Sequence, residues 1–366
     1  MEQTSPEHEI TKNEESKSQD KIVQERSAKL EEFVQSKPVQ IDLFNFLDLK
    51  PASRPRYSNT IELYDFMPKY YWGKVERIAG RFLESLEREF ECRGVKYKIQ
   101  ISPASIVDPD GVERYYYPSK REELVEDALR RLATTEKGLF LDDKAAVTFT
   151  LYQLQQELKA NGHSYSITQI KDALLICKKT NITVSTEDGK AIFVSNLFET
   201  LGLNTREDWQ EKGTDAKAFV RFNSLVTESI KRGSYRQLDY KKSMEYKSVI
   251  SRQLHKRISH HYTQADITKP YHIKLSTIIR DFGVTEYDQL RDNFRQVEFA
   301  LKEMEEKEVL LYFKCERIVD EMNRNKLLDV KFMLTPHPKF RSEVINANSR
   351  QRDISLQLPI NYKTTM

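Results

Sequence analysis

The chain has 366 residues, 31% of them charged and 39% hydrophobic, which predicts two domains of ordinary size with small cores and polar surfaces. It has no apolar stretch of the roughly 18 residues that a membrane span needs, and its start lacks the basic and apolar regions of a secretory signal. Cys92, Cys177 and Cys315 lie far apart without a CxxC pair, which fits a reducing cytosol and offers no cysteine zinc site.

The net charge of +3 conceals an uneven distribution. Residues 215–366 hold 28 Lys and Arg against 20 Asp and Glu, whereas residues 1–214 hold 31 against 36. The stretch 217–280 is the most basic, with 14 basic and 4 acidic residues. A basic stretch inside a patterned region favours contact with a phosphate backbone, and a solvated surface is the alternative interpretation.

The amino-terminal region is polar and has too few large apolar groups to offset the entropy of folding. We therefore predict that residues 1–56 form a disordered arm and linker. Within this arm, Gln40-Ile41-Asp42-Leu43-Phe44 is an isolated apolar island, which is typical of a docking peptide. Alternatively, the island packs onto the first domain as a strand or staple.

The following segment predicts the start of a folded domain. We expect the aromatic run Tyr57–Trp72 to pack onto that domain and Gly73–Phe90 to form a helix. Alternating residue types predict strands at 95–101 and 112–117. Because Asp108–Gly111 between them is a strong turn signal, we expect these two strands to form one hairpin.

A helix–turn–helix followed by a β-hairpin then occurs twice. Before the first copy, Ser119 is expected to cap a separate helix, with Glu122 at the capping-box position. The first copy comprises helices at Val147–Ala160 and Ser166–Lys179, a turn at Asn161-Gly162, and strands at Ile182–Thr186 and Ala191–Ser195. The second copy comprises helices at Lys247–Tyr262, Leu275–Phe282 and Tyr287–Lys307, a turn at Gly283-Val284, and strands at Val309–Cys315 and Leu328–Leu334. This order is that of a winged helix, so the repeat predicts two such domains.

The helix at Tyr287–Lys307 is the predicted recognition helix of the second domain. Its apolar residues recur at spacings of four and three, so they form one stripe that must face the core. They are Leu290, Phe294, Val297, Leu301 and Met304. The early turns then present polar side chains outward, where Arg suits guanine and Gln suits adenine. The predicted DNA-reading residues are Gln289, Arg291, Asp292, Arg295 and Gln296.

Basic residues that precede this motif are predicted to contact the DNA backbone and hold the domain in register. They are Arg236, Lys241, Lys242, Arg252, Lys256 and Arg257. Lys171 and Lys178 are the candidates on the recognition helix of the first domain. Ser276 and Thr277 are expected to cap the helix that precedes the second recognition helix, and contact with a phosphate is the alternative.

Signatures of catalysis and metal binding are missing from the sequence. His260 and His261 are adjacent, whereas a metal-dependent nicking site of the rolling-circle type needs two histidines that flank one apolar residue. Neither a GxxxxGK[ST] phosphate loop nor an HExxH pair occurs. We therefore predict no enzymatic activity, no metal and no cofactor.

Three stretches resemble the TrfA-type plasmid replication initiators, relatives of the iteron-binding Rep proteins. Gln40-Ile41-Asp42-Leu43-Phe44 is similar to the clamp-binding pentapeptide Gln-Leu-x-Leu-Phe, with Ile41 in place of a leucine. Ala146–Leu154, with the helix and wing that follow, resembles the first winged helix of the family. Tyr271–Leu275 and the motif after it resemble the second, so the likeness spans most of the chain.

The resemblance implies a function and a set of partners. It implies binding to tandem origin repeats, opening of an adjacent AT-rich element with contact to its single strands, and recruitment of the host initiator and replicative helicase. The pentapeptide implies docking on the sliding clamp, with Leu43 and Phe44 in an apolar pocket and Gln40 hydrogen-bonded at its rim. Dimers that restrain initiation are also implied, and Leu175 and Ile176 are candidates either for that contact or for ordinary core. The chain departs from the family at residues 200–216 and after Lys339, so nothing is carried over there.

These observations together predict an α+β protein of two tandem winged-helix domains behind a disordered arm. The predicted divisions are 1–56 for the arm and linker, 57–214 and 215–340 for the two domains, and 341–366 for a C-terminal tail. The predicted function is that of a cytoplasmic bacterial plasmid initiator that binds and deforms duplex origin DNA. A tandem winged-helix transcriptional regulator is the alternative, and it leaves the pentapeptide without a role.

Overall fold

A computed structural model describes residues 57–357, except for the segments 74–82, 108–109, 135–136, 204–216, 232–233 and 323–326 and residues 142 and 190. The predicted arm with its pentapeptide, and the end of the predicted tail, lie outside the described residues. No helix in the described part is long and apolar enough to cross a membrane.

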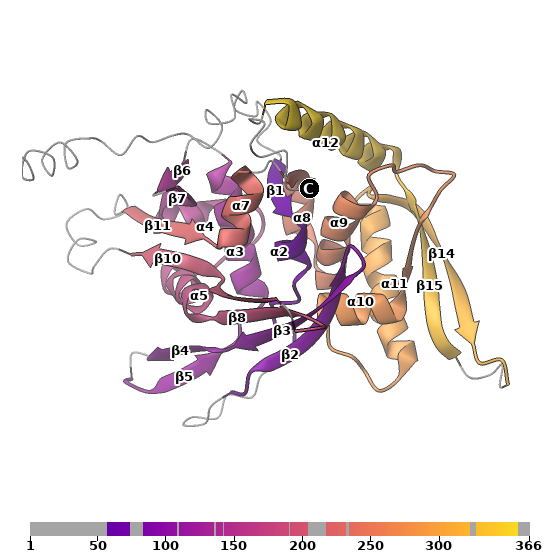
Figure 1. The fold of residues 1–366 in the computed structure, drawn as a ribbon, viewed down its shortest axis with the longest axis horizontal. Helices are drawn as coiled ribbons and strands as arrows, with labels where there is room; N and C mark the ends of the chain where they lie inside the picture. The colour runs from indigo at the N-terminus through magenta and orange to yellow at the C-terminus, as the bar shows by residue number, and fades with distance from the viewer. Residues whose placement is uncertain are drawn as a thin grey trace, which may run out of the picture. The chain divides into compact units, whose positions relative to one another are not determined.

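The first domain is built on three helices that pack against one another (Figure 1). They are α3 (Lys120–Ala133), α4 (Leu151–Ala160) and α5 (Ile167–Lys179). Each begins at a side-chain cap, and the expected capping box of Ser119 with Glu122 is present. Gly162 completes the turn between α4 and α5 with a φ of +85°, which glycine adopts without strain.

Two antiparallel four-stranded sheets complete this domain, in the orders β10-β11-β7-β6 and β2-β3-β8-β9. The first sheet contains β6 (Gly138–Leu141), β7 (Lys144–Thr150), β10 (Phe198–Gly202) and β11 (Lys217–Phe222). The second contains β2 (Leu86–Cys92), β3 (Val95–Ser102), β8 (Asn181–Thr186) and β9 (Ile192–Asn196). The expected wing is the β8–β9 hairpin, which β3 and β2 extend. A separate ribbon, β4 (Ala104–Val107) with β5 (Glu113–Tyr116), packs against α5.

The second domain is a winged helix whose elements follow the expected order. They are α9 (Val249–His261), β13 (Tyr271–Lys274), α10 (Leu275–Phe282), α11 (Leu290–Glu306), β14 (Leu310–Val319) and β15 (Leu327–Pro336). In its sheet the central strand is β15, where Phe332 pairs with Ile273 on one side and Cys315 on the other. Gly283 ends α10 in the left-handed conformation, as the predicted turn requires.

Six further elements lie outside these groups. They are β1 (Tyr57–Ile61), α2 (Glu62–Phe66), α7 (Ser224–Lys231), β12 (Tyr235–Asp239), α8 (Tyr240–Glu245) and α12 (Pro338–Gln357). β1 pairs with β12, and α2 contacts α9. The segment expected as a tail from residue 341 is mostly helix α12, which places Phe340 and Val344 in the second core.

The hydrophobic core divides between Met244 and Tyr246. One cluster of buried side chains extends from Ile61 to Met244, and the other from Tyr246 to Val344. Since Val220 of β11 and Val226 of α7 belong to the first cluster, residues 217–244 pack with the first domain. The packing therefore divides about 30 residues later than the boundary that we expected after residue 214.

Three expectations about local structure are wrong. The carboxyl end of the expected helix Gly73–Phe90 is strand β2, whose side chains alternate between exposed and buried positions. Strands β3 and β5 do not pair with each other, because Pro103, which has no amide hydrogen to donate, ends β3 and β4 intervenes. Residues 147–150 belong to β7, so the helix expected from Val147 begins at Leu151.

Candidate nucleic-acid interface

The predicted recognition helix α11 is fixed at its start and along one side. Asn293 accepts a hydrogen bond from the amide of Tyr287 at 2.8 Å and donates one to its carbonyl at 2.9 Å, which closes the turn before the helix. Of the predicted apolar stripe, Val297, Leu301 and Met304 are fully buried. Leu290 and Phe294 pack against the same core, so the expected inward face is confirmed.

The opposite side of α11 carries exposed basic side chains. Arg291 and Arg295 are one turn apart, and both are exposed. The side chain of Arg295 is 58% exposed and lies 3.3 Å from the carboxylate of Asp292. Such an exposed pair is weak, so it leaves the guanidinium available to a stronger anion.

The two glutamines of the predicted set differ in their surroundings. Gln289 is exposed at the N-cap of α11. Gln296 is only partly exposed, and its amide nitrogen is enclosed with no hydrogen-bond partner in the described part of the chain. Of the five predicted DNA-reading residues, Gln289, Arg291 and Arg295 therefore offer the most accessible polar atoms.

The wing lies beside α11 and adds further exposed basic groups (Figure 1). Lys314 and Arg317 of β14 are exposed, and the Lys314 ammonium lies 5.7 Å from the centre of the Tyr312 ring. The turn of the wing at residues 323–326 lies outside the described residues. Helix and wing together form the surface that a winged helix applies to a DNA groove and its phosphates.

The amino terminus of α10 is capped differently from the expectation. Its N-cap is Lys274, and Ser276 does not cap the helix. Instead Asp329 of β15 accepts hydrogen bonds from the Ser276 amide at 3.2 Å and from its hydroxyl at 2.6 Å. The predicted caps Ser276 and Thr277 are thus corrected, because a carboxylate from the wing satisfies this helix end.

The first recognition helix, α5, is covered over its carboxyl half. Ile176 is 1% exposed and packs against Ala104 and Ile106 of the β4–β5 ribbon, with Leu175 beside them. Of the two alternatives for Leu175 and Ile176, the structure therefore places them in a small intrachain core.

The basic residues predicted on α5 have limited access to solvent. Lys178 donates a hydrogen bond to the carbonyl of Glu199 at 2.7 Å, and Lys171 is half-buried. Their DNA contacts stay predictions. Lys179, which was not predicted, donates to the carbonyl of Ser105 at 2.8 Å and so ties α5 to the ribbon.

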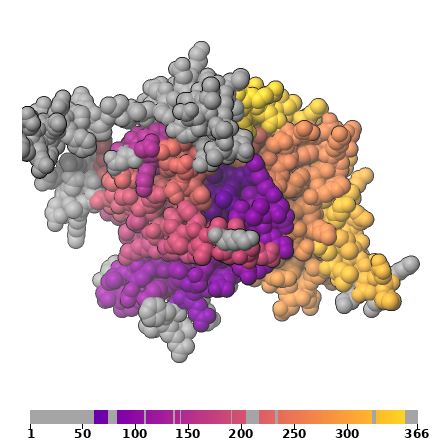
Figure 2. Space-filling view, viewed as in Figure 1, coloured from indigo at the N-terminus to yellow at the C-terminus, as the bar shows by residue number. Residues whose placement is uncertain are grey.

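Most of the basic run before the second motif is buried between the two domains, which adjoin along a continuous seam (Figure 2). Arg252 of α9 is fully buried and contacts Glu123 of α3 at 2.5 Å. Lys256 lies 3.0 Å from Asp127 of the same helix, and Arg257 lies 2.8 Å from Asp281. The basic face of α9 therefore neutralises the acidic face of α3.

Two carboxylates at this seam, Glu123 and Asp65, are held in their charged form. Burial alone would raise the pKa of Glu123, but the charges of Arg252 and Lys256 outweigh it and lower the pKa. Asp65 of α2 is buried beside Arg130 at 2.7 Å, and this cation likewise holds the pKa of Asp65 below its usual range against the effect of burial. Removing one partner would leave an uncompensated buried charge.

Two further basic residues of the predicted set connect to α12. Arg236 donates hydrogen bonds to Asn348 at 2.7 Å and to Gln351 at 2.9 Å. Lys242 is buried and lies 2.9 Å from Glu343. Five residues of the predicted set therefore have side chains that are enclosed and paired within the chain, and their contacts with DNA stay predictions. They are Arg236, Lys242, Arg252, Lys256 and Arg257.

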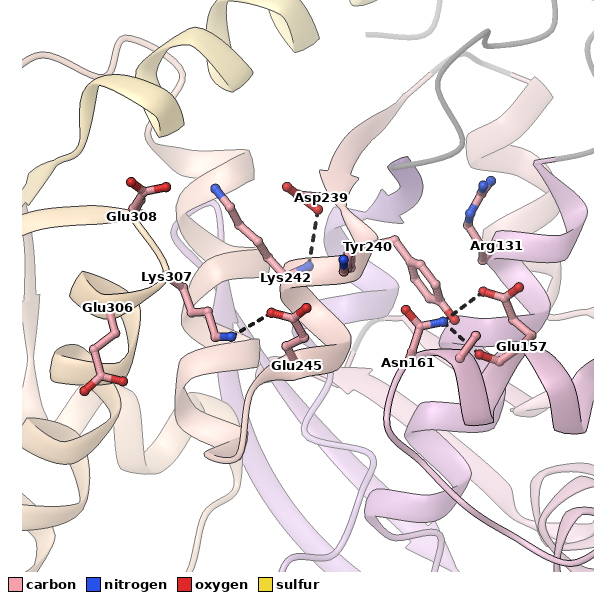
Figure 3. A pocket seen from close by; sticks show the side chains of 12 residues that line it. Arg131, Glu157, Asn161, Asp239, Tyr240, Lys242, Glu245, Glu306, Lys307 and Glu308 are labelled. Atoms are coloured by element: carbon pink, nitrogen blue, oxygen red, sulfur yellow. Dashed lines mark hydrogen bonds and ion pairs between the residues drawn. The ribbon is translucent and has the colours of Figure 1, made fainter.

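Lys241, the sixth member of that set, is exposed at a cavity of about 820 Å³ where α4, α8 and the end of α11 meet. Figure 3 shows that the lining charges are of both signs. Lys307 contacts Glu245 at 2.6 Å, and Asn161 donates to Glu157 at 3.2 Å. These internal pairs give the cavity no preference for one sign of charge, so the contact of Lys241 with DNA stays a prediction.

His255 and His260 at the seam are packed as neutral side chains. His260 stacks edge-on against Phe66 with ring centres 5.6 Å apart, and burial lowers its pKa to about 4. Burial also lowers the pKa of His255 to about 3. Within the described residues, no group of three or more His, Cys, Asp or Glu side chains is arranged to hold a metal ion.

One residue that the sequence reasoning missed lies on the outward side of α11. Phe299 follows Arg295 by four residues and is 57% exposed. The same helical spacing that selected the arginines would have found it, but its apolar type suggested a place in the core.

No protein-family model and no curated protein matches the chain. Among solved structures, a crystal structure of domains 2–3 of RctB is similar, with a TM-score of 0.44 and 9% identity over 77% of this chain and 99% of that one. A selenomethionine form of the same RctB domains gives a TM-score of 0.43 and 9% identity, over 70% and 92% of the two chains. A crystal structure of the Pi initiator protein in complex with iteron DNA gives 0.40 and 13% identity, over 60% and 91%. Because these TM-scores are below 0.5, the proposal below rests on the geometry of this chain.

Proposed function

We propose that this chain is a DNA-binding replication initiator of a bacterial plasmid and that it acts without enzymatic chemistry. The observation that carries the proposal is the exposed basic side of α11 beside the β14–β15 wing. A winged helix inserts the amino-terminal half of this helix into the major groove, where Arg291 and Arg295 are positioned to contact bases or phosphates.

Initiation is favoured over gene regulation by the sequence resemblance and by the pentapeptide Gln40–Phe44. A regulator that only binds its operator has no use for a clamp-docking peptide. In the proposed function the second domain binds repeated origin sequences and the first domain positions the chain on the DNA. The chain then promotes opening of an adjacent AT-rich region and recruits the host initiator, the replicative helicase and the sliding clamp in the cytoplasm, and its dimers restrain initiation.

Footprinting on the DNA that flanks the gene tests the proposal. We expect regularly phased protection over direct repeats, since an initiator of this kind occupies several equivalent sites. Protection of one isolated site near a promoter would instead identify a transcriptional regulator. No protection even at low ionic strength, where phosphate contacts are strongest, would exclude both.

The clamp contact is tested separately. The double substitution Leu43→Ala and Phe44→Ala removes the two apolar anchors, so we expect loss of binding to the purified sliding clamp with unchanged affinity for duplex DNA. Arg295→Ala is the matched control, because it should weaken DNA binding and leave clamp binding intact. Undiminished clamp binding by the double variant would remove this reason for preferring an initiator.

A further inference from the structure

An exposed aromatic ring lies among the cations on the outward side of α11. Arg291, Arg295 and Phe299 are each one turn apart, and Lys302 follows three residues later. Phe299 belongs to none of the three hydrophobic clusters in the described part of the chain, although Val297 and Ala300 nearby on α11 are fully buried. The ring therefore lies outside the hydrophobic cores of the described residues, and its exposure indicates a role other than packing.

The position of Phe299 relative to Arg295 places it within reach of the same groove. Four residues of helix rise about 6 Å along the axis, which is less than the major-groove width of about 12 Å. Phe299 is the tenth of the 17 residues of α11 and follows directly after its amino-terminal half, so a groove that Arg295 enters passes next to Phe299. Among the base edges exposed in this groove, the apolar group is the 5-methyl of thymine, and phenylalanine is one of the side chains that contacts it.

We propose that Phe299 is a specificity-determining residue that contacts the 5-methyl group of a thymine in the bound duplex. This inference rests on the proposed function and names a chemical feature of its DNA site. A protein partner docking on the ring is the competing explanation. Arg291, Arg295 and Lys302 lie on the same side of α11 as the ring and favour a polyanion, because the exposed pairs of Arg295 with Asp292 and of Lys302 with Glu298 are weak. The exposed Leu311 and Tyr312 belong to the wing strand β14 and not to α11.

The test uses the full chain and a duplex that it selects from a random pool. Each thymine of the selected duplex is replaced in turn by deoxyuridine, which removes the methyl group and keeps the base pair. We expect at least one replacement to weaken binding about fourfold, the effect of losing one buried methyl group. Phe299→Ala should bind the original duplex with a similar loss and should no longer respond to that replacement.

Two further variants complete the experiment. Phe299→Met keeps an apolar contact and should keep the response to deoxyuridine. Ile345→Ala removes an apolar side chain of similar exposure (54%) on α12 and should behave like the native chain. The inference is overturned if Phe299→Ala binds as tightly as the native chain, or if it keeps the same response to deoxyuridine. A pool that yields no selected duplex would overturn the proposed function itself.

Discussion

The two recognition helices follow the same plan but present different surfaces. On α5 the carboxyl half is covered by the β4–β5 ribbon, where Ile176 packs against Ala104 and Ile106. On α11 the outward side is exposed to solvent, and it carries Arg291, Arg295 and Phe299. Two winged helices in one chain therefore need not both expose a surface for DNA, because an inserted β-ribbon can pack against the helix of one copy and bury it.

The seam between the domains contains α3, which contacts α5, and α9, which contacts α11. Of the substitutions, one that breaks this seam should lower the free energy of unfolding most. Glu123→Gln leaves Arg252 and Lys256 buried with less compensating charge, so we expect the free energy of unfolding to fall by about 3–5 kcal/mol. Urea denaturation measures this change. Glu298→Gln, which removes an exposed pair with Lys302, is the control and should cost at most about 1 kcal/mol. Equal effects of the two substitutions would contradict the assigned burial.

The covered face of α5 and the bare face of α11 should differ in their contribution to stability. Ile176→Ala creates a cavity beneath the ribbon and should lower the free energy of unfolding by about 2–4 kcal/mol. Phe299→Ala removes an exposed ring and should change it by less than about 0.5 kcal/mol. Thermal or urea unfolding of the two variants compares them directly, and a large loss for Phe299→Ala would mean that its ring is packed.

The affinity for DNA should depend more on the exposed side of α11 than on α5. Arg295→Ala should cost about 1–3 kcal/mol of binding free energy if the side chain reads a base, and the loss should be confined to the preferred sequence. Lys178→Ala, on α5, should have little effect because its ammonium is already bonded to Glu199. Fluorescence anisotropy with specific and scrambled duplexes separates base reading from phosphate contact. A larger loss for Lys178→Ala would make α5 the main reading helix.

The last prediction concerns the pH dependence that the histidines of the seam give to stability. His255 and His260 have folded-state pKa values of about 3 and 4, below the ordinary 6.5, so the unfolded chain binds protons more readily. Stability should therefore fall as the pH drops below 6.5, by about 1.4 kcal/mol per pH unit for each histidine. Between pH 6.5 and 5.5, above the ordinary pKa values of 4.5 for Glu and 3.8 for Asp, the acidic residues stay mostly charged even in the unfolded chain, so His255→Gln should reduce this slope by about half. An unchanged slope would assign the pH dependence to other groups.

Local signals in the sequence predicted much of the fold. The cap at Ser119, the turn at Gly283 and the spacing of Val297, Leu301 and Met304 depend only on neighbouring residues, and each was confirmed. The partners of strands depend on residues far away in the chain. The pairing of β1 with β12 and the separation of β3 from β5 could not be read from either segment alone.

The basic run shows why the candidate site was only partly predictable. A cluster of positive charge has the same appearance in the sequence whether it binds phosphate or a carboxylate of the same chain. Glu123 and Asp127 on α3 were visible as an acidic helix, but only the fold shows that they contact Arg252 and Lys256. Arg291 and Arg295 stay accessible because the residues that pack against α11 contact its other sides.

The enclosed pairs of Glu123 with Arg252 and Lys256 make the chain respond unequally to dissolved ions. Counterions screen charges at the surface far more than buried charges. In the proposed function, a rise in potassium concentration therefore weakens the contacts with DNA phosphates before it weakens the contacts between the two domains. The folded protein is then released and binds again when the potassium concentration falls.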